Sequence, residues 1–198
     1  MAHRQTRWLR RLILLLVGAA ALAASLIAVG IFDPRPLGPV QWEQTLSTQT
    51  IPAEARQLVW LDHPLPAVFS LRLTAAYQRG ETDVGYGLAL GDDSRYLAVA
   101  VSPLGYVSIW QTDTSAGQIA DTVLLPWQSW PHVRTGAAAN ELWLDAAGGQ
   151  VTVHLNREWL WTGPVASVGG RPGVLAESFG APVVIDFQML QLFAAEPG

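Results

Sequence analysis

The sequence predicts an all-β domain, built as a two-sheet antiparallel sandwich of the jelly-roll type and preceded by one N-terminal transmembrane helix. Two patterns in the 198 residues lead to this prediction. Near the N-terminus lies one long uncharged apolar run. Beyond it, short segments rich in Val, Leu, Trp and Tyr recur between Gly, Pro, Asp and Asn, which is typical of strands joined by turns. No later segment shows a convincing helical period.

The uncharged run covers residues 12–32 and reads LILLLVGAAALAASLIAVGIF. At about 1.5 Å per residue, a helix of this length crosses the ~30 Å hydrocarbon core of a bilayer. Arg4, Arg7, Arg10 and Arg11 precede it. The positive-inside rule therefore predicts a cytoplasmic Arg-rich tail over residues 1–11 and an extracytoplasmic domain, in a single-pass protein of the cell membrane. Cleavage of a signal peptide within residues 19–24 is the alternative, and it would also export the domain.

Three prolines fall between residues 33 and 39, so residues 33–41 are expected to form a stiff spacer. The domain then covers residues 42–196. Its predicted strands are residues 57–62, 68–77, 84–90, 96–102, 106–111, 122–125, 141–145, 151–155, 159–162, 173–178 and 183–193. Several of them alternate apolar and polar residues, as expected for sheets with one face in a core.

Composition excludes several classes of function. The chain has no cysteine, which excludes disulfides, thiolate metal sites and lipoprotein acylation. From Asp33 onward, eight Arg stand against sixteen carboxylates, so this part has a net charge of −8. An acidic domain without a basic patch repels phosphate backbones, so no nucleic-acid partner is expected.

From Tyr86 onward the sequence contains a series of segments in a recognisable order. The first is YGLALGDDSRYLAVAVSPLGYVSIW (residues 86–110), and the others are RTG (134–136), NEL (140–142), VTVHLN (151–156), GRPGVLA (170–176) and FQMLQLF (187–193). In their order and spacing they resemble concanavalin A-like lectin/glucanase domains, and more closely the sandwich of the 3-keto-disaccharide hydrolase domain family and its laminin G-like relatives. This resemblance implies a concanavalin A-like sandwich of a bacterial, membrane-anchored protein.

The same fold hosts lectins, glycosidases and adhesion modules, so function has to be argued from a site. Relatives carry paired Asp in the closing strand, where this chain has Gln188 and Met189. Glycosidases need two carboxylates across a cleft, and the E-x-D-x-E pattern of laminarinase-type enzymes is absent. The nearest approach, Glu81-Thr82-Asp83, lies beside Gly80 in an expected turn. We therefore expect no catalytic residues.

Metal-binding signals are equally sparse. His3, His63, His132 and His154 have no ligand spacing relative to one another. Asp92 and Asp93 are candidate calcium ligands, but the hairpin expected at residues 91–94 also explains them. No other cofactor is expected.

Tryptophan is the most suggestive feature, with nine residues in the chain and eight of them after Leu12. Flat indoles stack on sugar rings and also offer a polar N–H group. A sandwich without disulfides also needs large core residues, and we expect Trp60, Trp159 and Trp161 to pack. For other indoles, packing and binding both remain open. The candidate ligand-binding residues are Tyr106, Trp110, Trp127, Trp130, Arg134, Trp143 and His154.

These observations favour a non-catalytic binding module whose ligand is a glycan. One alternative is a protein-interaction or sensory ectodomain that docks onto an envelope protein, which predicts a contiguous apolar and aromatic patch. A second alternative is a glycoside hydrolase, which requires two carboxylates converging in a cleft. The lipid bilayer is the expected partner of residues 12–32.

Overall fold

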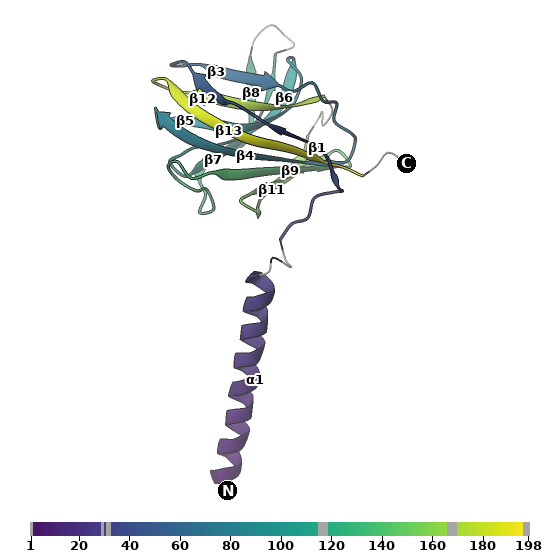
Figure 1. The fold of residues 1–198 in the computed structure, drawn as a ribbon, viewed down its shortest axis with the longest axis vertical. Helices are drawn as coiled ribbons and strands as arrows, with labels where there is room; N and C mark the ends of the chain where they lie inside the picture. The colour runs from purple at the N-terminus through teal and green to yellow at the C-terminus, as the bar shows by residue number, and fades with distance from the viewer. Residues whose placement is uncertain (1, 29, 31–32, 115–118, 166–169, 196–198) are drawn as a thin grey trace. The chain divides into compact units, whose positions relative to one another are not determined.

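The computed structural model describes residues 2–28, 30, 33–114, 119–165 and 170–195. The chain divides into two compact units, residues 1–35 and residues 36–198. The first unit contains α1, Ala2–Ala28 (Figure 1). Among its described residues, no helix meets the length and hydropathy needed to cross a membrane. Positions 29, 31 and 32 of the predicted span lie outside the described residues.

The second unit is an antiparallel sandwich of two sheets, which confirms the predicted all-β fold class. Sheet A has seven strands in the order β1-β13-β4-β9-β10-β11, with β2 also pairing with β13. Its strands are β1 (Val40–Thr45), β2 (Thr48–Ile51), β4 (Phe69–Gly80), β9 (Asn140–Ala147), β10 (Gln150–Leu155), β11 (Glu158–Pro164) and β13 (Val183–Phe193).

Sheet B has six strands in the order β3-β12-β5-β6-β7-β8. Its strands are β3 (Arg56–Trp60), β5 (Val84–Gly91), β6 (Arg95–Val101), β7 (Tyr106–Asp113), β8 (Ala120–Ser129) and β12 (Arg171–Ser178). The edge strands of sheet B are therefore β3 and β8.

Strand alternation fills the space between the sheets. Leu71 and Leu73 of β4, Leu142 of β9, and Leu88 of β5 are at most 1% exposed and belong to one apolar cluster. Residues between them on each strand point away from this core. Sheet B therefore has an outer face, formed by the side chains that point away from sheet A.

The chain enters the sandwich through the end of the expected spacer. The backbone N–H of Leu37 donates to Ser70 Oγ at 2.8 Å, and the N–H of Ala194 donates to the carbonyl of Pro39 at 3.1 Å. β1 then runs antiparallel to β13, starting with Val40 opposite Phe193. The last residues of the spacer are thus held by sheet A.

Candidate functional site

The outer face of sheet B has a floor of small residues on its two central strands. Gly85 and Ala89 lie on β5, and Ala98 and Ala100 lie on β6, where Ala98 is paired with Ala89. All three alanines are completely buried, although they face away from the main core. Small residues at these positions leave room for large side chains from the flanking strands to lie over the sheet.

Aromatic rings occupy that room. Trp110 of β7 and Tyr96 of β6 are 5% and 7% exposed, and they pack with Leu175 and the three alanines in a second apolar cluster. Trp60 and Leu58 of β3 pack against this cluster. The middle of the outer face is therefore a packed layer that leaves little space for a ligand.

Two glycines leave the space in which the indoles of Trp127 and Trp60 lie on this layer. A β-carbon at position 85 would lie 2.9 Å from Cζ2 and Cη2 of Trp127. A β-carbon at position 173 would lie 2.7 Å from Cε3 of Trp60. These separations are shorter than van der Waals contact, so each indole rests directly on backbone that only glycine leaves free.

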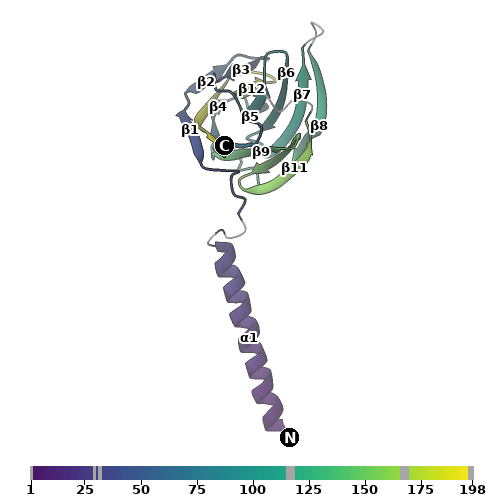
Figure 2. The ribbon, with the colours of Figure 1, turned by 90° about the vertical axis from the view of Figure 1, so that its right-hand side faces the viewer.

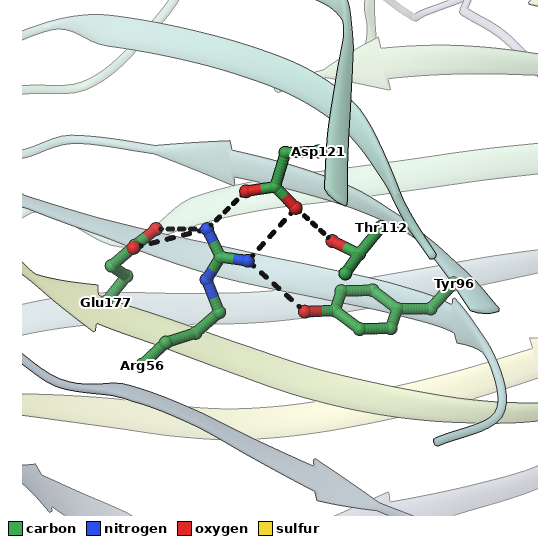
Figure 3. A network of polar contacts seen from close by, with 5 residues as sticks. All are labelled: Arg56, Tyr96, Thr112, Asp121 and Glu177. Atoms are coloured by element: carbon green, nitrogen blue, oxygen red, sulfur yellow. Dashed lines mark hydrogen bonds and ion pairs between the residues drawn. The ribbon is translucent and has the colours of Figure 1, made fainter. Parts of the chain in front are cut away.

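A polar network crosses the same face and joins the two edge strands of sheet B (Figure 3). Arg56 of β3 donates from Nη2 to Asp121 Oδ2 of β8 at 2.8 Å. The same nitrogen donates to both oxygens of Glu177 of β12, at 3.2 and 3.1 Å. Thr112 donates to Asp121 Oδ1 at 2.6 Å, and Arg56 Nη1 lies 3.4 Å from the hydroxyl of Tyr96. We call these five residues the Arg56 network.

The electrostatics of the network favour the charged forms of Arg56 and Asp121. Burial alone would lower the pKa of Arg56, but the hydrogen bond to Asp121 and the charge of Glu177 outweigh it and raise that pKa. Burial alone would raise the pKa of Asp121, but the hydrogen bonds from Arg56 and Thr112 lower it overall. The guanidinium also lies 5.4 Å from the ring centre of Trp110, within cation–π range.

Two hollows open beside this network. The first, of about 380 Å³, is lined by Asp83, Val84, Ser102, Leu104, Tyr106, Trp127 and Phe179. The second, of about 280 Å³, is lined by Arg56, Ser108, Trp110, Asp121, Val123, Pro126, Trp127, Glu177 and Phe179. Trp127 and Phe179 line both hollows. Their ring centres are 6.4 Å apart and their planes are perpendicular.

The walls of the hollows combine exposed aromatic surface with polar groups. Tyr106, Trp127 and Phe179 are 43%, 39% and 43% exposed. In the second hollow, Trp110 Nε1 and Arg56 Nε are buried donors without a hydrogen-bond partner among the described residues. Volumes of this size suit a small molecule or a few units of a polymer. Figure 2 shows β7 and β8, which carry three of the wall aromatics, side by side along one flank of the sandwich.

The structure brings three of the predicted ligand-binding residues together, namely Tyr106, Trp110 and Trp127. Tyr106 and Trp127 face the first hollow, and Trp110 faces the second. Of these three, Trp110 is the most buried, so it presents little surface to a ligand.

The other predicted residues lie elsewhere. Trp130 packs against the main core and lies 6.0 Å from the ring of His132. Arg134 is exposed and donates from Nη1 to the carbonyl of Ala139 at 3.2 Å. Neither residue lines the two hollows described above.

Trp143 and His154 lie on the outer face of sheet A, on the far side of the core. Trp143 is 1% exposed and donates from Nε1 to Asp145 Oδ1 at 2.7 Å. The guanidinium of Arg72 lies 4.2 Å from its ring centre. His154 Nε2 is 3.3 Å from Asp145 Oδ2. Trp143 therefore serves packing here and offers no ring face to solvent.

The three indoles expected to pack behave differently from one another. Trp161 packs against the main core, and Trp60 packs on the outer face of sheet B. Trp159 is 58% exposed, so the expectation that it packs was wrong. It lies on β11, which ends the pairing order of sheet A and pairs there with β10.

The candidate calcium ligands are engaged by the protein. Asp92 Oδ1 accepts hydrogen bonds from the backbone N–H groups of Ser94 and Arg95 at 2.8 and 2.9 Å. The hydroxyl of Ser94 adds a further bond, and these interactions lower the pKa of Asp92. Asp93 accepts from Trp60 Nε1 at 2.8 Å and from Arg171 at 3.2 Å. Among the described residues, no group of three or more His, Asp or Glu could hold a metal ion.

Sequence reasoning missed Arg56, Asp121, Glu177 and Phe179. Arg56 and Glu177 are direct partners in the β3–β12 ladder, and opposite charges at paired strand positions are a recognisable signal once the register is known. Asp121 sits on the edge strand at the opposite side of the sheet, and nothing local in the sequence links it to Arg56. Phe179 follows β12 directly and has no apolar periodicity around it.

Comparison with known proteins supports the fold. No family model and no curated protein matches the sequence. Among solved structures, a carbohydrate-binding module, CBM66 from Bacillus subtilis, matches with a TM-score of 0.59 and 10% identity, covering 80% of this chain and 99% of that one. A GH16 protein of a mixed-linkage glucan locus of Bacteroides ovatus, in complex with a G4G4G3G product, matches with a TM-score of 0.53 and 8% identity over 74% and 80% of the two chains. The second unit of this chain thus has the concanavalin A-like sandwich fold that the sequence resemblance predicted.

Proposed function

We propose that the chain is a binding protein for a glycan, which it holds without cleaving at the two hollows on the outer face of sheet B. The observation that carries this proposal is the exposed wall formed by Tyr106, Trp127 and Phe179 beside convergent polar groups. Aromatic faces provide contact area for the apolar faces of a sugar, and polar neighbours orient its hydroxyl groups. The fold shared with a carbohydrate-binding module supports the same role.

Hydrolysis is the second candidate, because Asp121 and Glu177 converge on one nitrogen atom. A glycosidase likewise needs two carboxylates that converge on one place. However, the guanidinium of Arg56 occupies the space between them, where the scissile bond would have to lie. Asp121 also has a lowered pKa, which is the opposite of what a general acid needs. We expect no release of products from oligosaccharides that the protein binds.

Glycan-array binding of the purified full-length chain, with and without calcium, tests the proposal. We expect reproducible binding to one class of sugar that is independent of calcium, because protein donors already engage Asp92 and Asp93. Trp127→Ala and Phe179→Ala should each weaken binding about tenfold, as expected for loss of a stacking ring. Trp159→Ala is the matched control, since it removes an exposed indole from sheet A. A blank array from folded protein would overturn the proposal and favour a protein partner for the same apolar surface.

Membrane anchoring through residues 12–32 belongs to the same proposal. Its support is the uncharged apolar run and the arginines that precede it. Anchoring would hold the sandwich outside the membrane, where glycans of the envelope or the surroundings are accessible.

A further inference from the structure

The first hollow combines three aromatic rings with one carboxylate. Tyr106, Trp127 and Phe179 supply the rings, and Asp83 supplies the charge. The remaining lining residues are Val84, Ser102 and Leu104, so none of the described residues that line the hollow is cationic. An aromatic wall next to a carboxylate is the chemistry that recognises an organic cation, because ring faces and the carboxylate both attract positive charge.

The Asp83 carboxylate has no other evident role. Asp83 is exposed, and within the described part of the chain no side chain forms a hydrogen bond or an ion pair with its carboxylate. Its backbone is engaged, since the carbonyl accepts from the N–H of Phe179 at 3.1 Å and the N–H donates to Glu81 Oε1 at 3.1 Å. These bonds hold Asp83 against Phe179 and leave the carboxylate free to contact a ligand.

The rings form a corner and not a single flat platform. The planes of Trp127 and Phe179 are perpendicular, with centres 6.4 Å apart. The benzene ring of Trp127 is fixed over Gly85, and Phe179 is fixed through its backbone bond to Asp83. A compact ammonium group in such a corner can lie within about 6 Å of more than one ring centre, as cation–π attraction requires.

The charge around the hollow favours the same ligand. The nearby Arg56 is neutralised by Asp121 and Glu177, so it does not attract anions. The chain from Asp33 onward carries a net charge of −8, which raises the local concentration of cations and repels acidic sugars.

We infer that the first hollow binds an organic ammonium group, held by Asp83 and by the rings of Tyr106, Trp127 and Phe179. This inference rests on the proposed function, and it names the kind of glycan: one that carries a positively charged amine or ammonium substituent. The group could belong to an amino sugar or to a non-sugar substituent, and the test separates these two sources.

Calorimetric titration of the full-length chain with matched probes tests the inference. Choline is compared with 3,3-dimethylbutan-1-ol, in which carbon replaces the charged nitrogen. A glucosamine trimer is compared with its fully N-acetylated counterpart, which has the same length and no charge. We expect each cationic probe to bind about tenfold more tightly than its neutral partner. For the glucosamine trimer, this advantage should disappear at a pH where its amines are neutral, whereas choline binding should not change.

Variants assign the effect to the hollow. Asp83→Asn, which keeps the shape of the side chain, should abolish most of the preference for the cationic probes, and Trp127→Leu should weaken both members of each pair. Glu158→Gln is the control, because Glu158 is an exposed carboxylate on β11 of the other sheet. If the Asp83→Asn variant still prefers the cationic probes over their neutral partners, the inference is overturned.

The outcomes separate this inference from the proposed function. Binding of neutral glycans with no gain from a positive charge would overturn the inference and leave glycan binding intact. Binding of choline without any glycan would support the cation site and overturn glycan binding. If only the glucosamine trimer binds, both stand and the source is an amino sugar. If neither cationic probe binds, the inference is wrong.

Discussion

At position 85 the absence of a side chain leaves room for the benzene ring of Trp127, whose Cζ2 and Cη2 atoms would lie 2.9 Å from a β-carbon there. The ring is the far end of a side chain and can move, whereas the strand beneath it is fixed by its neighbours β12 and β6. Gly85 therefore determines the position of the Trp127 ring, which lines both hollows.

Gly85→Ala should consequently displace Trp127 and weaken ligand binding several-fold, with little change in thermal stability. The expected stability change is small because an alanine suits a strand at least as well as glycine does. Titration calorimetry and thermal unfolding measure the two effects. In a Trp127→Ala background the same change should have no further effect on binding, since the ring that it displaces is gone. An additive loss in the double variant would show that Gly85 acts by another route.

Among elements, the Arg56 network joins β3 and β8, the two edge strands of sheet B, across the outer face. The side chains of Arg56, Asp121 and Glu177 are 22%, 32% and 20% exposed, so the ions are partly withdrawn from water. Removing the cation leaves two carboxylates close together without compensation. The repulsion between these two carboxylates lowers the free energy of unfolding more than the loss of a surface ion pair does.

Arg56→Met should lower the free energy of unfolding by about 2 kcal/mol at neutral pH, while retaining much of the apolar contact with Trp110. Arg95→Met is the control, because Arg95 pairs with Asp113 at 2.6 Å with side chains 49% and 38% exposed. The control should change stability by at most about 0.5 kcal/mol. Urea denaturation of both variants measures the difference. Equal effects would mean that the Arg56 network behaves as an ordinary surface pair.

The same variant has a predicted pH dependence. Asp121 has a lower pKa in the folded chain than its usual value of about 4. Such a carboxylate adds stability above that pH, and the added stability is lost as the pH falls through the folded pKa. Arg56→Met removes the largest of the causes that lower this pKa, so the stability difference between the parent chain and the variant should shrink from pH 7 to pH 3. Repeating the urea denaturation at both values measures this, and an unchanged difference would contradict it.

The elements that sequence predicts well are those with a repeating pattern. Every strand predicted from residue 57 onward corresponds to a strand in the structure, because apolar residues such as Phe69, Leu71 and Leu73 alternate along it. β1 and β2 lack this signal. Five of the six residues of β1 are exposed, and the strand is held by its pairing with β13, more than a hundred residues away.

The candidate site was predictable only where one strand carries its residues. Tyr106 and Trp110 share a face of β7, so their common orientation follows from the period of a strand. The sequence does not predict how the remaining candidates divide between the two sheets. Which sheet a strand joins depends on long-range pairing, and so does the sheet on whose outer face its outward-pointing residues lie. Trp143 and Trp110 both oppose core leucines or isoleucines locally, yet they lie on opposite sides of the sandwich.

At the scale of the whole molecule, a basic, an uncharged apolar and an acidic segment follow one another along the chain. Residues 1–11 carry four arginines and no carboxylate, residues 12–32 are uncharged, and the acidic sandwich comes last. This order is typical of a protein that is anchored by its N-terminal segment with its domain outside the cytoplasm. The acidic sandwich would then attract the cationic ligands proposed for the first hollow.

The anchoring proposal predicts that the full-length chain sediments with membranes and stays there after extraction at alkaline pH. Replacing Leu15 and Ala20 by Arg should release it, because each charge near the centre of a spanning helix costs about 3 kcal/mol. Replacing Leu15 by Phe and Ala20 by Leu is the control and should leave it in the membrane. Protease added to intact cells should degrade the sandwich if the arginines of residues 4–11 remain inside. A parent chain that appears in the soluble fraction would contradict the anchor, and a membrane-bound chain protected from external protease would contradict its orientation.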